Sequence, residues 1–143
     1  MLYTAATRKA MKLCFLAHKD QVDKSGMPYV FHPFHLAEQM RDEATTVAAL
    51  LHDVVEDMPY TFRDLEEMGF SPEVIAALRL LTHDEGEEYL AYVARIRENP
   101  IAKAVKLADL RHNSDLSRLD RVDEKALARA EKYKAAIKLL GEE

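Results

Sequence analysis

The sequence predicts an all-α fold, a bundle of about seven or eight helices, from three observations. Apolar residues recur at intervals of three and four along most of the chain, the spacing that gives a helix one buried face. No run alternates convincingly between apolar and polar residues, as a half-buried strand would. With 143 residues and 48% hydrophobic side chains, the chain can bury a full core, and we expect a single domain over residues 1–143.

The first half of the chain predicts three helices. The first carries an apolar stripe at steps of four and three: Leu2, Ala6, Ala10, Leu13 and Ala17. A turn over residues 23–28 and a short extended segment over residues 29–31 follow. Pro33 suits the first position of a second helix that ends near Met40. The third helix has the cleanest pattern, with apolar residues spaced by three and one without a gap: Val47, Leu50, Leu51, Val54, Val55 and Met58.

The second half predicts five more helices. Thr61 and Asp64 have the spacing of a capping box at the start of a short helix. The next helix begins over residues 71–73, which supply an N-cap serine, a first-turn proline and a first-turn acid. Two further helices, over residues 87–98 and 100–119, are separated by an Asn-Pro step. The last helix carries its apolar residues on one side: Ala126, Ala130, Tyr133, Ile137 and Leu140.

Composition excludes several classes of protein. The net charge of −5 argues against a partner such as nucleic acid or an anionic membrane, because such binders carry a basic excess. The single cysteine, Cys14, excludes a disulfide framework and a cysteine-built zinc site, and we expect it in the core. No apolar run approaches the ~18 residues of a membrane span. Basic residues interrupt the apolar N-terminus that a signal peptide would need, so we expect a soluble, cytoplasmic protein.

The candidate chemistry lies beside the apolar stripe of the third helix. His52, Asp53, Glu56 and Asp57 occupy positions i, i+1, i+4 and i+5, and should project from one side of that helix. Three carboxylates and an imidazole crowd two turns there with no cation among them, which costs free energy unless something positive lies between them. A bound divalent cation would supply that charge. The bland alternative is a chance His-Asp pair on a solvated helix.

Further ligands must come from elsewhere in the chain. His32 and Asp109 are candidates, and Asn113 lies one turn beyond Asp109 on the same face. Two imidazoles and two carboxylates suit Mn²⁺, Fe²⁺ or Zn²⁺ with positions open to water and substrate. Glu56 and Asp57 could then orient or deprotonate the attacking water. The remaining histidines are interpreted as structural or surface residues: His18, His35, His83 and His112.

Three segments, in order, resemble the HD-domain alarmone hydrolases of the RelA/SpoT type. They are AHKDQVDKSGMPYVFHP from Ala17, LLHDVVED from Leu50 and VKLADLRHN from Val105. The resemblance covers most of the chain and implies a single all-α HD hydrolase domain. It implies that one metal, usually Mn²⁺, is bound by His32, His52, Asp53 and Asp109. It also implies that Glu56 and Asp57 act on water, and that Lys24, Ser25 and Asn113 contact the substrate.

The implied reaction is removal of pyrophosphate from the ribose 3′ position of (p)ppGpp, a small-molecule nucleotide. Two departures fall on substrate contacts. Asp23 stands where relatives that act on guanine alarmones commonly carry arginine, and Asp115 and Leu116 stand where they often carry arginine and threonine. An adenine alarmone (ppApp) or a nicotinamide dinucleotide phosphate is therefore an alternative substrate. A non-catalytic nucleotide-binding module is a further alternative.

Overall fold

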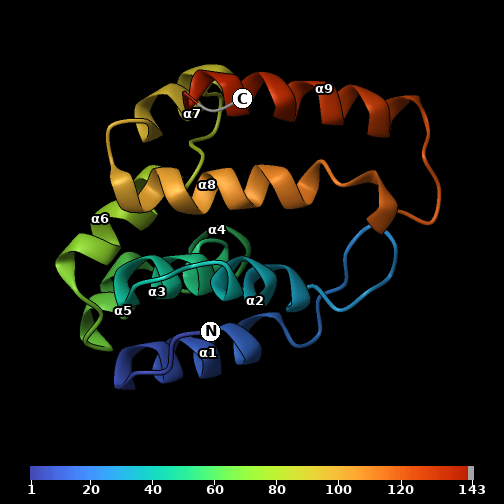
Figure 1. The fold of residues 1–143 in the computed structure, drawn as a ribbon. Coiled ribbons are helices and arrows are strands. Elements are labelled where there is room, and N and C mark those ends of the chain that lie inside the picture. Colours follow the sequence, from blue (N-terminus) through green and yellow to red (C-terminus); the bar gives the residue numbers. More distant parts are fainter. Residues whose placement is uncertain (142–143) are drawn as a thin grey trace.

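The computed structural model describes residues 1–141 and confirms the all-α fold (Figure 1). Its helices are α1 (Ala5–His18), α2 (Phe31–Glu38), α3 (Glu43–Leu51), α4 (Val54–Asp57), α5 (Phe62–Glu67), α6 (Pro72–Leu81), α7 (Tyr89–Ile96), α8 (Pro100–Asn113), the 3₁₀ turn η1 (Leu116–Arg118) and α9 (Glu124–Leu139). Within residues 1–141, β-type pairing is confined to an isolated bridge between Val22 and Pro28. None of these helices is both long enough and apolar enough to cross a membrane.

Helix α3 is the centre of the molecule. Every residue from Thr45 to Leu51 is buried, so this helix is covered on all sides rather than on one face. Helices α1, α2, α6 and α8 pack around it. In Figure 1, α8 lies between α9 on one side and the layer of α2 and α3 on the other. The buried residues of α8 include the polar Lys106 and Asp109, which must find charged or hydrogen-bonding partners in the interior.

The residues predicted to cap the starts of two helices are confirmed in that role. Thr61 and Asp64 form a reciprocal capping box at the start of α5. The Ser71 hydroxyl accepts a hydrogen bond from the backbone N–H of Val74 at the start of α6 (3.3 Å). Cys14 is fully buried, as expected. Pro33 is the third residue of α2 rather than the first, a position where its missing N–H is still not needed.

Three predicted elements are wrong. The third helix is not continuous, because the chain turns at His52 and Asp53 and resumes as the separate α4. The extended segment over residues 29–31 is instead a turn, in which the backbone N–H of His32 donates to the Tyr29 carbonyl (2.9 Å). Helix α8 ends at Asn113, where the carbonyl of His112 accepts hydrogen bonds from the backbone N–H of Asp115 (3.2 Å) and from Arg118 Nη1 (2.8 Å).

Two long segments meet at one end of the bundle. The loop after α1 and the segment around η1 lie side by side at the right of Figure 1. The backbone N–H of Asp120 donates to Ser25 Oγ (3.3 Å), and Arg118 Nη2 lies 3.9 Å from Asp23 Oδ2. A positive φ of 79° at Gly26 lets the first loop turn back toward α2. This contact forms one wall of the cavity described below.

Candidate active site

Helices α2 and α8 and the end of α3 bring three candidate ligands together. His32, His52 and Asp109 each offer a ligand atom, and these atoms lie within 4.8 Å of one another. Nε2 of His32 is 2.8 Å from Asp109 Oδ1, and Nε2 of His52 is 3.6 Å from the same oxygen. All three residues are buried. The cluster could hold a metal ion.

Asp53 lies beside this cluster. Its Oδ2 is 3.0 Å from Nε2 of His52 and accepts a hydrogen bond from the hydroxyl of Tyr29. The chain break after α3 makes this possible, because Asp53 sits at the N-cap of α4 rather than inside a continuous helix. The four predicted residues therefore do not share one side of a single helix, although His52 and Asp53 still meet.

The state of His52 fits a metal ligand. Its Nδ1 lies 2.6 Å from the carbonyl oxygen of Ala49, which can only accept, so Nδ1 carries a proton. Its Nε2 is buried without a hydrogen-bond partner of suitable geometry. A buried nitrogen that faces two carboxylates and lacks such a partner suits a cation, with the backbone bond holding the ring in place.

His112, interpreted from the sequence as structural, contacts the cluster directly. Its Nδ1 is 2.7 Å from Nδ1 of His32, and its ring stacks on those of His32 and His35. Burial and the positive charge of Arg118 lower the pKa of His112 to about 3, so the ring stays neutral and its unprotonated nitrogen can accept a hydrogen bond. His112 can therefore hold the His32 tautomer whose Nε2 faces Asp109. The sequence offered one signal for this contact: His112 lies three residues after Asp109, and therefore on the same face of α8.

The charges of the cluster are strongly coupled. Burial by itself would raise the pKa of Asp109, but Lys106 and the two imidazoles hold that pKa well below its ordinary value. Burial would likewise lower the pKa of His52, but the carboxylates of Asp53 and Asp109 raise it well above its ordinary value. Asp109 therefore remains ionised, as a carboxylate ligand must.

The two carboxylates of α4 have different surroundings. Glu56 lines a cavity with His52, Asp53 and Asp109, and burial together with the charge of Asp53 raises its pKa. The Asp57 carboxylate accepts from the side-chain amide of Gln21 (3.5 Å). Burial and Asp53 raise the pKa of Asp57 as well. Glu56 is therefore the carboxylate that shares a solvent-filled space with the candidate ligands.

Two cavities adjoin the cluster. We call the first the larger cavity; it has a volume of about 340 Å³ and is lined by residues that include Gln21, Asp23, Lys24, Ser25, Tyr29, His32, Asn113, Arg118, Arg129 and Tyr133. The second, the smaller cavity, has a volume of about 120 Å³ and is lined by His52, Asp53, Glu56, Leu81, His83, Tyr89, Tyr92, Val105, Lys106 and Asp109. They share no lining residue: His32 lines the larger cavity, and the other three candidate ligands line the smaller one.

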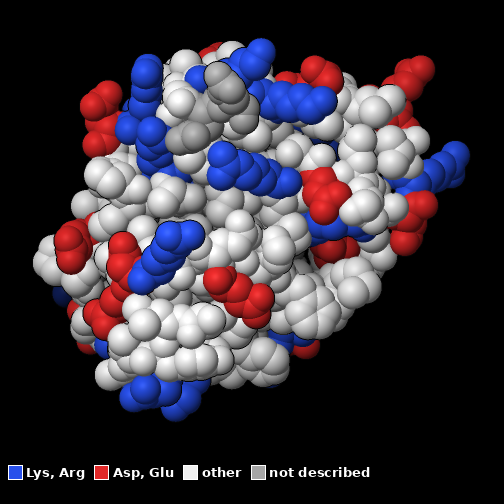
Figure 2. Space-filling model, viewed as in Figure 1, with Lys and Arg blue, Asp and Glu red and all other residues white. Residues whose placement is uncertain are grey.

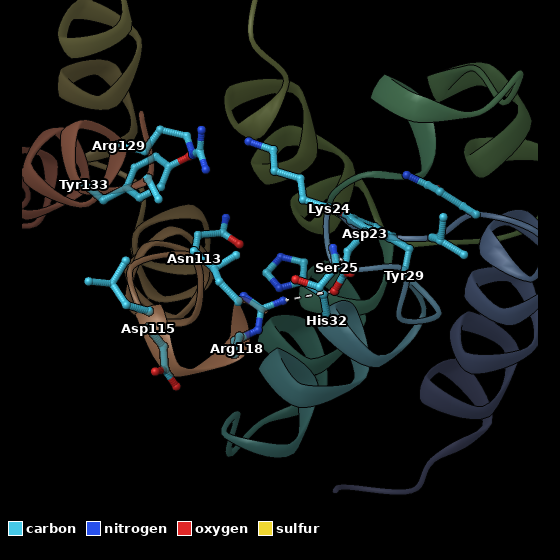
Figure 3. Close-up of a pocket in the computed structure, with 15 residues that line it drawn as sticks. Asp23, Lys24, Ser25, Tyr29, His32, Asn113, Asp115, Arg118, Arg129 and Tyr133 are labelled. Carbon is cyan, nitrogen blue, oxygen red and sulfur yellow. Dashed lines mark hydrogen bonds and ion pairs between the residues drawn. The ribbon is translucent and has the colours of Figure 1, made fainter. Parts of the chain in front are cut away.

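The larger cavity brings together all three predicted substrate contacts. Figure 3 shows Lys24 and Ser25 entering from the loop after α1, and Asn113 from the end of α8. The amide of Asn113 also donates to Asp109 Oδ1 (3.0 Å), which links this cavity to the cluster. Arg129 and Tyr133 of α9 were missed as site residues. Their spacing of four, which puts them on one helix face, was a signal for them.

Positive charge near the site is local rather than global. On the face drawn in Figure 2, Lys and Arg side chains are interspersed with Asp and Glu. Lys24, Arg118 and Arg129 nevertheless line the larger cavity, in a chain whose net charge is −5. Three further basic residues belong to the motif segments: Lys19 and Arg111 are exposed and line neither cavity, whereas Lys106 lines the smaller one.

Comparison with known proteins finds relatives that are named as (p)ppGpp hydrolases, as GTP pyrophosphokinases or as bifunctional enzymes. The chain is 32% identical over 120 residues to the bifunctional (p)ppGpp synthase/hydrolase SpoT of Escherichia coli, covering 74% of this chain and 17% of that protein. It is 32% identical over 133 residues to the guanosine-3′,5′-bis(diphosphate) 3′-pyrophosphohydrolase of Aquifex aeolicus, covering 85% of this chain and 18% of the relative. No family model matches the chain.

A solved structure has the same fold over almost the whole chain. It is described as a metazoan ortholog of SpoT that hydrolyzes ppGpp, and it matches with a TM-score of 0.73 and 28% identity, covering 98% of this chain and 85% of that one. The chain belongs to the RelA/SpoT-type HD-domain family. It spans less than a fifth of the length of the two curated relatives named above. In this RelA/SpoT-type domain, the three motif segments supply Tyr29 and His32, then His52 to Asp57, then Lys106 to Asn113.

Proposed function

We propose that the chain is a metal-dependent hydrolase that removes the 3′-diphosphate of (p)ppGpp-type nucleotides as pyrophosphate. The observation that carries this proposal is the buried group of His32, His52 and Asp109 between two cavities, with the Glu56 carboxylate in the smaller one. The names of the relatives support the same reaction, since they include guanosine-3′,5′-bis(diphosphate) 3′-pyrophosphohydrolases. We take residues 1–143 to act as one HD domain.

The metal would be held by His32, His52, Asp53 and Asp109. Mixed imidazole and carboxylate ligands suit Mn²⁺, our first choice, with Fe²⁺ and Zn²⁺ as alternatives. A divalent cation at this position supplies positive charge for the phosphoryl oxygens and lowers the pKa of bound water. The orphaned Nε2 of His52 and the hydrogen bond between Tyr29 and Asp53 support this ligand set.

The proposed reaction breaks the bond between phosphorus and the ribose O3′. The oxygen of a water molecule bonds to that phosphorus, Glu56 accepts a proton from the water, and O3′ takes up a proton as it leaves. The products are a nucleotide with a free 3′-hydroxyl and pyrophosphate. The raised pKa of Glu56 suits a general base, which must compete for a proton and still release it. Asp57, which accepts a hydrogen bond from Gln21, would help to orient the water.

The nucleoside and its 5′-phosphates would occupy the larger cavity. Lys24 and Arg118 provide cations for phosphate, and Asn113 and Ser25 provide groups that hydrogen-bond to ribose. Arg118 lies next to Asp23, the residue that stands where relatives commonly carry arginine. Its guanidinium lies 3.9 Å from the Asp23 carboxylate, so an arginine group is present at the place where the loop itself carries an acid.

Asp23 also favours a second candidate substrate. A carboxylate cannot stack on a base as a guanidinium does, and its own oxygen Oδ1 is held by the backbone N–H groups of Ser25 and Met27 (2.9 and 3.0 Å). An adenine alarmone or a nicotinamide dinucleotide phosphate, with the same 3′- or 2′-phosphorylated ribose chemistry, is therefore the alternative. With ppApp the group released would again be pyrophosphate, whereas with a nicotinamide dinucleotide phosphate it would be inorganic phosphate. The residues that act on water would be unchanged.

The test is pyrophosphate release from ppGpp by chelator-stripped protein, with and without added Mn²⁺. We expect release that needs Mn²⁺ and that falls by about 10²- to 10⁴-fold in Glu56→Gln. Parallel assays of pyrophosphate release from ppApp and of inorganic phosphate release from a nicotinamide dinucleotide phosphate separate the candidate substrates. Stoichiometric binding of Mn²⁺ and nucleotide with no turnover of any of the three would overturn the enzyme in favour of a binding module.

A further inference from the structure

The smaller cavity contains a buried cation that the proposed reaction has not yet used. Lys106 is 91% buried, its exposed fraction being 9%. Its Nζ donates to Asp109 Oδ2 (3.0 Å) and lies 5.1 Å from the ring centre of Tyr92 and 5.9 Å from that of Tyr89. Among the described residues that line this cavity, it is the one Lys or Arg side chain.

This ammonium group has donors to spare. A lysine ammonium carries three N–H donors, and the bond to Asp109 uses one of them. The hydroxyl of Tyr92 donates to the carbonyl of Leu81, and its oxygen is still able to accept from Lys106; among the described residues, however, the hydrogen bond that the ammonium makes is the one to Asp109. The cavity volume of about 120 Å³ far exceeds the ~10–15 Å³ that one water needs, so a larger polar group can enter.

The geometry of the attack of water on phosphorus indicates which polar group would enter the smaller cavity. In an in-line attack, water approaches phosphorus from the side opposite the leaving O3′. The proposed function puts the ribose in the larger cavity with Asn113; the attacked phosphorus would then lie at the candidate ligands, with its remaining oxygens toward the smaller cavity. One of those oxygens carries the terminal phosphate of the 3′-diphosphate. Glu56, the residue that takes the proton, lies in that same cavity.

We propose that the smaller cavity binds the terminal phosphate of the 3′-diphosphate, with Lys106 as its cationic contact. This inference rests on the proposed function and assigns a specificity site to it. Lys106 thus has two partners, Asp109 on one side and a phosphate oxygen on the other. The consequence is selectivity for a 3′-diphosphate over a 3′-monophosphate, because a monophosphate leaves the ammonium without its second partner.

The test compares two ligands that differ only in the terminal phosphate: guanosine 5′-diphosphate 3′-diphosphate and guanosine 5′-diphosphate 3′-monophosphate. Their dissociation constants are measured on Mn²⁺-loaded Glu56→Gln protein, which should turn them over far more slowly than the wild type, with and without Lys106→Met. The ratio is the dissociation constant of the 3′-monophosphate divided by that of the 3′-diphosphate. We expect this ratio to fall by roughly 10- to 100-fold in the Lys106→Met protein, the range of a hydrogen bond to a charged group. Each protein is measured with Mn²⁺ bound to the same occupancy, so that the ratio reports the ligands and not the metal content.

Two further variants make the result decisive. Lys106→Gln keeps a donor for Asp109 but removes the charge, so it should lower the ratio even if Lys106→Met is poorly folded. Lys24→Met is the matched control in the larger cavity and should weaken both ligands while leaving their ratio unchanged.

Two outcomes would overturn the terminal-phosphate site: a ratio that neither Lys106 variant moves, or a ratio that Lys24→Met lowers equally. The wild-type protein is assayed for hydrolysis of both nucleotides in parallel. If hydrolysis persists and the ratio does not move, the site is wrong but the proposed function stands. If no hydrolysis occurs while the ratio moves as expected, the enzyme is wrong but the phosphate site stands.

Discussion

Replacing His112 with leucine should weaken Mn²⁺ binding by about 10- to 100-fold, the range found for groups that orient metal ligands. Nδ1 of His112 is 2.7 Å from Nδ1 of His32. When Nε2 of His32 binds a cation, the ring proton sits on Nδ1 and needs an acceptor. One such hydrogen bond is worth about 0.5–1.5 kcal/mol, which accounts for up to roughly tenfold. Loss of the orientation of the His32 ring accounts for the rest.

The measurement is competition for Mn²⁺ between the protein and a chelator of known affinity. His112→Asn is the matched control, because its side-chain oxygen can accept a hydrogen bond near the place of Nδ1, and it should bind Mn²⁺ nearly as well as the wild type. Leucine keeps apolar packing against the rings of His32 and His35, so thermal stability should change little. Wild-type affinity in His112→Leu, or equal weakening by both substitutions, would refute the tautomer argument.

Three further predictions concern the site and its supports. Tyr29→Phe removes the hydroxyl that donates to Asp53 but keeps the ring, so Mn²⁺ affinity should fall by about tenfold with an unchanged circular dichroism spectrum; unchanged affinity contradicts it. Leu50→Ala empties a fully buried position of α3 and should lower the free energy of unfolding by about 2–5 kcal/mol in urea titrations; a loss under 1 kcal/mol would mean that the α3 core is looser than described. Asp42→Ala removes the N-cap of α3 and should cost about 1 kcal/mol at pH 7. Because hydrogen bonds from the backbone and hydroxyl of Thr45 lower the pKa of Asp42 in the folded state, its contribution is complete above the unfolded value and is lost as pH falls through the folded one. Unfolding curves of Asp42→Ala and wild type should therefore converge below about pH 4, and a constant difference down to pH 2 argues against the cap.

The sequence alone was sufficient where partners are close along the chain. The capping box of Thr61 and Asp64 and the N-cap of Ser71 join residues three apart, and both are present as predicted. The apolar spacing of three and four predicted the helices because helical geometry is itself local. The His-Asp pair at residues 52 and 53 was recognisable for the same reason, as an unusual crowding of acids and imidazole without a cation.

What the sequence could not decide depends on distant residues. The chain turns between α3 and α4 at His52 and Asp53, where the Asp53 carboxylate meets Tyr29, which is 24 residues away. His32 and His112 are 80 residues apart, and their contact exists only because α2 packs on α8. Lys106 has the sequence environment of an ordinary surface lysine, yet α7 and α8 bury it among two tyrosines and Asp109.

The composition and motifs therefore determined the class of fold, the family and the set of candidate ligands. The tertiary structure decided which side chains share a cavity, which carboxylate faces the ligands, and where the buried cation lies. The physical reason is that helix formation and capping depend on neighbours within one or two turns, whereas the burial and the pKa of a side chain depend on whatever the packing of other helices brings to it.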